Sequence, residues 1–283
     1  MINRPIWFND LGLRKYIPIN IYTAIHTSRF HGANRLRNAL KLQTVDTELW
    51  ISRAIVELSL PHTIFIDVGA QHGRHIKHLF EHGSGEVSAV ACEANPNLAA
   101  RLKSFNREIA AGRMTLVEAA IGESNSPVEF FINNEDSGYS GLKPRPIKEV
   151  KDSYTRCEAQ QVKIDDIKNS LRFPVSCIKV DVEGAEMGVF QGALKTLQTD
   201  TPAVIFECVK NAAPFYGSNL TAAMQWFEKL GYSLSTITGQ PVGKREAKHF
   251  FENQLCCDFV AVPTKCQEKT NSLLQQISVA HCR

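Results

Sequence analysis

An α/β fold with a mostly parallel sheet is predicted for this chain of 283 residues. From residue 62 onward, short β-branched runs alternate with helix-like segments, and most of these runs are apolar nearly throughout. Strands of this kind are buried on both faces, as in a parallel sheet covered by helices. The last two runs have no long helical pattern between them, which predicts an antiparallel hairpin at the sheet edge. The expected sheet therefore has about seven strands, of which five are parallel.

The parallel strands are expected at TIFIDVGA (63–70), EVSAVACEA (86–94), RMTLVEAAIG (113–122), SCIKVDVEG (176–184) and PAVIFECV (202–209). The edge hairpin is expected at GYSLSTITG (231–239) and CDFVAVP (257–263). The polar stretch 133–161 is rich in glycine, serine and proline, so it predicts a long loop, and loops of that length usually carry function. Residues 270–281 predict a short amphipathic helix.

Residues 1–60 show no strand-like alternation, and apolar residues recur at helical spacing from about Arg35 to Leu60. Pro61 ends this pattern. We therefore expect a helical lid or accessory segment over residues 1–60 and one domain over residues 61–283.

Composition excludes several classes of protein. The net charge is +3, from 32 basic and 29 acidic residues, which is too small to indicate nucleic-acid binding. No apolar window is long enough to span a membrane, and the first residues lack the apolar core of a signal peptide, so a soluble cytoplasmic protein is expected. The eight cysteines are scattered without a C-x-x-C pair, which favours buried or incidental thiols.

The turn after the first strand has the spacing D-x-G-x-x-x-G, formed by Asp67, Gly69 and Gly73. Ligands of open α/β sheets bind at the carboxyl ends of the strands, and glycine lets the backbone approach them closely. The middle glycine of the dinucleotide pattern G-x-G-x-x-G is missing, which argues against an NAD enzyme. By itself the motif also fits a tight strand-to-helix turn without a ligand.

Two acidic features reinforce the cofactor interpretation. Glu93 ends the second run, where an acid in such folds accepts hydrogen bonds from both ribose hydroxyls; the alternative is an exposed glutamate at a strand end. Asp181, Glu183 and Glu186 follow the fourth run, and a buried strand does not end in alternating carboxylates without reason. Helix capping explains Glu186 easily but Asp181 less well.

The segments IFIDVGAQHGRH, AVACEANPNLAARL, VEAAIGE, SGYSGL, IKVDVEGAEMGVFQGA and PAVIFECV occur in this order. Over about residues 62–210 the chain thereby resembles the FkbM-type methyltransferases, S-adenosylmethionine-dependent enzymes with the class I methyltransferase (Rossmann-like) fold. The D-V-E-G-A-E block is the most specific part of the resemblance. Gln71 stands where the family usually has asparagine, and His75 where it has an aromatic residue.

The resemblance implies a site and a reaction. Asp67, Gly69, Ala70 and Gly73 would line the methionine portion of the cofactor, Glu93 would hold the ribose, and Ala120 would lie near the adenine. The full set expected to bind S-adenosyl-L-methionine is Asp67, Gly69, Ala70, Gln71, His72, Gly73, Glu93, Ala94, Ala120 and Asp181. Family members methylate hydroxyl oxygens, commonly of sugars or small secondary metabolites.

A hydroxyl needs a proton acceptor to become a good nucleophile, and Asp181 is the preferred candidate because its strand end faces the cofactor. Glu207 is the second candidate, and Glu183 and His72 are further ones. The expected partner is a small-molecule or saccharide hydroxyl, with no nucleic acid. The alternative in another class is a binding protein that keeps this fold but holds a nucleotide without turnover.

Three histidines after Gly73 raise the question of a metal site. His75, His78 and His82 share one face of the expected helix, at spacings that allow metal binding. The helix runs away from the strand ends, however, and carries the last two histidines away from the site. We therefore expect no metal there, and interpret these histidines as partly exposed residues of the helix face.

Overall fold

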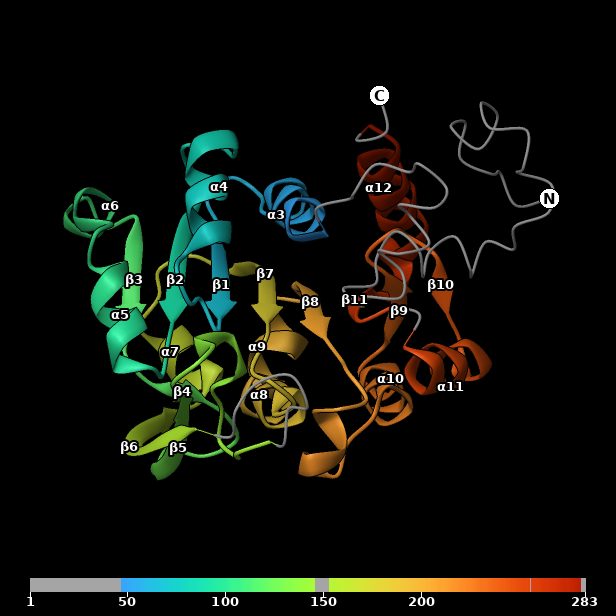
Figure 1. Cartoon of the computed structure of the whole chain (residues 1–283). Coiled ribbons are helices and arrows are strands. Elements are labelled where there is room, and N and C mark those ends of the chain that lie inside the picture. The colour runs from blue at the N-terminus through green and yellow to red at the C-terminus, as the bar shows by residue number, and fades with distance from the viewer. Residues whose placement is uncertain (1–46, 146–152, 255, 281–283) are drawn as a thin grey trace, which may run out of the picture.

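The computed structural model describes residues 47–145, 153–254 and 256–280. At its centre is an eight-stranded sheet in the order β10-β9-β11-β8-β7-β1-β2-β3 (Figure 1). The five strands predicted to be parallel are β1 (Ile64–Val68), β2 (Ser88–Cys92), β3 (Met114–Val117), β7 (Val175–Val180) and β8 (Ala203–Glu207). All of them pair in parallel, so the predicted fold class is confirmed.

Helices cover both faces of the sheet because the central strands are apolar on both sides. One face packs against α3 (Thr47–Leu58), α4 (Arg74–His82) and α12 (Gln267–Ala280). The other face packs against α7 (Ile164–Asn169), α8 (Glu186–Gly192), α9 (Leu194–Thr199) and α10 (Leu220–Lys229). The two short helices α5 (Pro96–Leu102) and α6 (Asn106–Ala110) connect β2 to β3. The carboxyl ends of the parallel strands therefore meet at one open edge (Figure 1).

The prediction of an edge hairpin is wrong about how its two strands are connected. β9 (Tyr232–Thr236) and β11 (Asp258–Pro263) do pair in antiparallel fashion, but β10 (Pro241–Val242) and α11 (Lys244–Asn253) lie between them in the chain. β11 is inserted between β8 and β9 and runs antiparallel to both. The helix escaped prediction because Ala247 and Phe250 are its only buried residues.

A second, three-stranded sheet was not predicted. It has the order β4-β6-β5 and is formed by β4 (Ala120–Ile121), β5 (Pro127–Asn133) and β6 (Tyr154–Val162). The single third strand that was predicted is therefore divided into two strands, β3 and β4. The last residues of the predicted loop, from Tyr154 onward, form β6. β5 and β6 consist mostly of exposed and half-buried residues with few buried ones, so no continuous apolar run marks them. In the view of Figure 1 this sheet lies beyond the carboxyl ends of β2 and β3.

The described part of the amino-terminal segment is α3, and the predicted helical pattern is present there. Ile51, Ala54 and Ile55 pack into the core of the sheet face shared with α4. Residues 1–46 lie outside the described residues, so the lid and the division at residue 60 stay predictions. The predicted carboxyl-terminal helix is confirmed as α12. Across the described ranges, no helix is both long and apolar enough to cross a membrane.

Candidate active site

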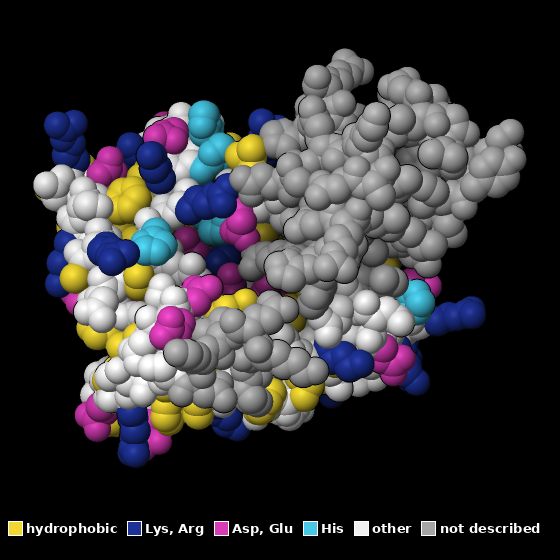
Figure 2. All heavy atoms as spheres, viewed as in Figure 1, with side chains coloured by type: hydrophobic (Ala, Val, Ile, Leu, Met, Phe, Trp, Pro, Cys, Tyr) yellow, Lys and Arg dark blue, Asp and Glu magenta, His cyan; other side chains and the backbone are white. Residues whose placement is uncertain are grey.

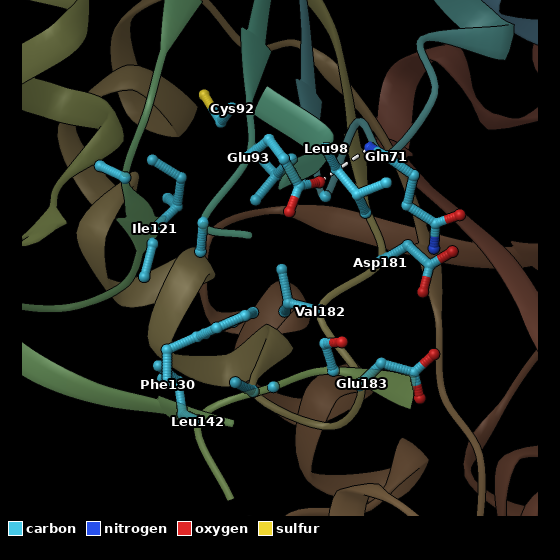
Figure 3. A pocket seen from close by; sticks show the side chains of 18 of the residues that line it. Gln71, Cys92, Glu93, Leu98, Ile121, Phe130, Leu142, Asp181, Val182 and Glu183 are labelled. Atoms are coloured by element: carbon cyan, nitrogen blue, oxygen red, sulfur yellow. Dashed lines mark hydrogen bonds between the residues drawn. The ribbon is translucent and has the colours of Figure 1, made fainter. Parts of the chain in front are cut away.

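A pocket opens at the carboxyl ends of β1, β2 and β7, and the small sheet closes its other side (Figure 3). Of the predicted cofactor residues, those that line it are Gly69, Gln71, Glu93, Ala94, Ala120 and Asp181. The predicted loop contributes Ser137, Gly138, Ser140, Gly141 and Leu142, which belong to the SGYSGL segment of the resemblance but were given no role in the predicted site. The structure thus brings the separate motifs of the chain to one place.

The turn between β1 and α4 forms one wall of this pocket. The backbone N–H groups of Gly69 and Ala70 both donate to the Cys92 carbonyl at 3.0 Å, which fixes the turn against β2. Gly69 has φ 78°, and a Cβ there would lie 2.0 Å from the Asp181 carbonyl oxygen. Gly73, with φ 71°, packs against Leu102 and Phe105 instead of lining the pocket. Glycine at these two positions allows the turn and its close packing.

Glu93 is held rigidly at the pocket wall. Its Oε2 accepts a hydrogen bond from the Gln71 N–H at 2.8 Å (Figure 3), and its Oε1 accepts one from the Asn95 N–H at 2.8 Å. Burial raises the pKa of Glu93, and the bonds from Asn95 and Gln71 oppose this rise. Each carboxylate oxygen keeps a lone pair for a second donor. The side chain is therefore a preorganised acceptor for a pair of hydroxyls.

Beside Glu93, the wall is apolar. Leu98, Ile121, Phe130, Leu142 and Val182 surround the space next to the carboxylate (Figure 3). An apolar slot with a few placed polar groups is the usual architecture of a small-molecule site. The acceptor Glu93 and these apolar side chains together fit an adenosine whose ribose contacts Glu93 and whose base packs against the apolar wall.

The turn after β7 carries the next acids and is strained. Glu183 has φ 59° and Gly184 has φ 107°, and a Cβ on Gly184 would lie 2.7 Å from the Ala212 carbonyl carbon and oxygen. Glu186 Oε1 accepts a hydrogen bond from the Gly184 N–H at 2.9 Å and so braces the turn. Burial raises the pKa of Glu186 to about 7, although backbone hydrogen bonds from Gly184 and its neighbours oppose the rise. Glu186 is thus a buried brace, which leaves Asp181 and Glu183 to line the pocket.

Arg145 contacts this turn from another part of the chain, and no sequence pattern predicted this contact. Its guanidinium pairs with Glu183, and its Nη1 donates to the Asn211 carbonyl at 3.3 Å. The Arg145 side chain is only 3% exposed. The pair ties the end of the pocket-lining segment 137–145 to the turn after β7.

Three carboxylates gather at this edge. One oxygen each from Asp181, Glu183 and Glu207 lie within 4.8 Å of one another, a spacing that would suit a cation. Asp181 already pairs with Lys179 at 3.2 Å, and Glu183 already pairs with Arg145. We therefore assign no metal to this group. Glu207, the second candidate base, lies at the end of β8 near Asp181 but does not line the pocket.

The histidines after Gly73 differ from one another. His75 is buried, with Nδ1 2.8 Å from Ser52 Oγ and Nε2 3.5 Å from Glu48, so its interpretation as a partly exposed residue was wrong. The reason is that α3 packs on this side of α4. His78 is half-buried and His82 is exposed, with ring centroids 4.3 Å apart, as expected of helix-face residues. His72 is exposed in the loop and does not line the pocket.

Asp67 and Ala70 lie behind the pocket wall. Asp67 is 0% exposed, and neither carboxylate oxygen has a hydrogen-bond partner among the described residues. Its Oδ1 lies 4.0 Å from Nζ of Lys179, a buried lysine that sequence reasoning missed. Burial raises the pKa of Asp67, and Lys179 opposes this rise. Asp67 does not line the pocket, and its predicted contact with the cofactor stays a prediction.

Comparison with known proteins follows from this geometry. The family model described as the methyltransferase FkbM domain matches residues 67–234. No curated protein matches the chain. Among solved structures, a methyltransferase FkbM from Methylobacillus flagellatus KT is 14% identical with a TM-score of 0.43, and the match covers 89% of this chain but only 60% of that one. A putative methyltransferase from Streptococcus mutans in complex with SAH is 9% identical with a TM-score of 0.41, over 78% of this chain and 98% of that one. A putative rRNA methylase from Clostridium thermocellum is 8% identical with a TM-score of 0.44, over 78% and 99% respectively.

Proposed function

The chain belongs to the FkbM family of methyltransferases, which use S-adenosylmethionine, and from this premise we propose that it methylates a hydroxyl oxygen of a sugar or another small molecule. One observation carries the proposal: Glu93 and Asp181, from motifs 88 residues apart, line the same pocket. Glu93 is an acceptor for ribose hydroxyls, and Asp181 is an acceptor for the proton of the substrate. The site therefore holds both groups that the reaction needs.

In this proposal, the residues of the chain divide the work. Bound S-adenosylmethionine supplies a methyl group already activated on a sulfonium. Glu93 and the apolar wall hold the nucleoside, and Gln71 lies beside Asp181 (Figure 3). Asp181 accepts the hydroxyl proton of the acceptor, while Phe130 and Leu142 exclude water from the pocket. We prefer Asp181 to Glu207 as the base because Asp181 lines the pocket.

The charges at the pocket favour an uncharged, hydroxyl-rich acceptor. Asp181, Glu183 and Glu207 lie together at this edge, and acidic side chains lie at the central hollow of the face seen in Figure 2, beside basic and histidine side chains. Lys179 and Arg145 offset two of these charges, but the carboxylate oxygens still accept hydrogen bonds from hydroxyls and repel phosphates. A saccharide or polyol therefore suits the pocket better than a nucleic acid.

The test has two stages. Titration calorimetry with S-adenosylhomocysteine should show micromolar binding, and its absence would count against the whole proposal. Formation of S-adenosylhomocysteine from S-adenosylmethionine is then followed across a panel of saccharides, polyols and RNA. Turnover with saccharides or polyols supports the proposal. Cofactor binding without turnover on any acceptor supports the alternative, a nucleotide-binding protein on the same fold.

Variants test the division of roles. Asp181→Asn should lower kcat by about 100-fold or more, because a general base contributes on that scale, and should leave the affinity for S-adenosylhomocysteine nearly unchanged. Glu207→Gln should have a smaller effect on kcat. An equal loss of cofactor affinity and turnover in the Asp181 variant would contradict the proposed base.

A further inference from the structure

Lys179 is a buried lysine in the middle of the sheet. It lies on β7 directly opposite Asp67 on β1 in the parallel register, and the residue is 6% exposed. Its Nζ is 3.2 Å from Asp181 Oδ2 and 4.0 Å from Asp67 Oδ1. The ammonium is therefore located between the acid of the D-V-G turn and the acid of the D-V-E-G turn.

We propose that Lys179 is a positioning residue of the methyl-transfer site: its ammonium joins the two acidic motifs and holds the carboxylate of Asp181 in its reactive orientation. This inference rests on the function proposed above. Lys179 does not line the pocket, so it acts through Asp181 and not on the substrate.

The geometry of Asp181 supports this role. Its Oδ2 accepts a hydrogen bond from the Lys179 ammonium, whereas its Oδ1 is buried and has no hydrogen-bond partner among the described residues. Anchoring one oxygen fixes the rotamer of the side chain. Lys179 is therefore the side chain that fixes the orientation of this carboxylate, within the part of the chain that the structure describes.

The charge balance around the ammonium supports it as well. Among the described residues, the charged and titratable groups that face Lys179 are Asp181 at the end of β7, Asp67 on β1, Glu48 on α3, Glu93 after β2 and, through Asp67, His75 on α4. Burial disfavours the ammonium, but Asp181 and Asp67 outweigh burial and raise the pKa of Lys179. Asp67 in turn has no hydrogen-bond donor among the described residues to stabilise its charge. Without the ammonium, the two carboxylates would repel each other, and the pair would take up a proton at higher pH.

The experiment compares the full-length wild type with Lys179→Met, Asp67→Asn and the double variant. Lys179→Met removes the charge at similar length. We expect it to lower kcat about 100-fold, to change the affinity for S-adenosylhomocysteine less than about tenfold, and to move the acid limb of the kcat–pH profile to higher pH. In the double variant the limb should return toward that of the wild type while kcat stays low, because the repulsion is gone but Asp181 is still unanchored.

Lys168→Met is the matched control. Lys168 pairs with Asp200 at 3.5 Å, away from the pocket, so its loss should leave kcat and the pH profile unchanged. If Lys179→Met does not fold, Asp67→Asn tests the same network. In that variant the Lys179 ammonium no longer faces the Asp67 charge and interacts more strongly with Asp181, so the acid limb should move to lower pH.

The outcomes separate the two proposals. A wild-type chain that forms no S-adenosylhomocysteine with any acceptor overturns the proposed function, and this inference with it. An active wild type whose acid limb stays in place in both single variants overturns the inference alone. The same holds if Lys179→Met lowers the melting temperature but keeps kcat within a fewfold of the wild type.

Discussion

Arg145 and Glu183 form an ion pair whose side chains are only 3% and 14% exposed, although 38 residues separate them in the sequence. Arg145 ends the segment whose Ser137–Leu142 stretch lines the pocket, and Glu183 lies in the strained turn after β7. The pair thus connects the side of the pocket contributed by the small sheet to the side that carries Asp181. Loss of the pair should affect both the stability and the shape of the site.

Arg145→Met should therefore destabilise the chain by about 3 kcal/mol, because it removes the guanidinium that faces a largely buried carboxylate. It should also lower kcat/KM for the acceptor, since the wall at Ser140 and Leu142 is no longer held. Denaturant unfolding and steady-state kinetics measure the two effects. Arg156→Met is the control: its pair with Glu129 is 66% and 55% exposed, so its loss should cost less than about 1 kcal/mol. Equal losses in the two variants would contradict the role of burial.

Glu93→Ala should weaken binding of S-adenosylhomocysteine by about 10- to 100-fold. The carboxylate is expected to accept the ribose hydroxyls, and hydrogen bonds to a charged group contribute about 1.5–3 kcal/mol. It also holds the Gln71 N–H of the cofactor turn. Calorimetry measures the loss, and Glu86→Ala, at an exposed pair with His62 near the opposite end of β2, should not change the affinity. Unchanged affinity in the Glu93 variant would remove the ribose site from the proposal.

Three glycine-to-alanine variants separate backbone strain from steric overlap. Gly85→Ala meets no atom within 4 Å at ordinary φ and should be nearly neutral. Gly112→Ala has the same free space but φ 68°, so it should cost about 1 kcal/mol. Gly69→Ala adds an overlap at 2.0 Å with the Asp181 carbonyl and should cost about 3 kcal/mol or more. Thermal unfolding ranks the three, and a Gly69 variant as stable as the Gly112 one would show that the turn can move away from β7.

The contrast between predicted and missed residues has a physical cause. Glu93 and Asp181 were predictable because each follows an apolar run, and the ends of parallel strands must meet at one edge of a sheet. Arg145, His75 and Lys179 were not, because their roles depend on partners from other elements. His75 is buried only because Ser52 and Glu48 of α3 lie over it. Residues of this kind carry no local pattern.

The same reasoning applies to the strands. β1 and β7 were predicted because both faces of each are covered, which requires apolar residues throughout. β6 was missed because it forms a small sheet with one side toward solvent, so its sequence YTRCEAQQV resembles that of a polar loop. α11 was missed because its sequence KREAKHFFEN is mostly charged and polar. Sequence patterns therefore predict the buried centre of this fold better than its edges.

Glu186 makes the stability of the chain depend on pH. Burial raises its pKa to about 7, above the value of 4.5 for an exposed glutamate, so the folded chain holds a proton that the unfolded chain has already released. The resulting stabilisation is complete below pH 4.5 and is lost as the pH rises to about 7, by roughly 3 kcal/mol at most. Glu186→Gln cannot titrate, so the stability of the wild type relative to this variant should fall between pH 5 and pH 8. Denaturant unfolding at both pH values gives this difference, from which the contributions of Asp67 and Glu93 cancel because both chains contain them. Parallel pH dependence of the two chains would mean that Glu186 titrates like an exposed carboxyl group.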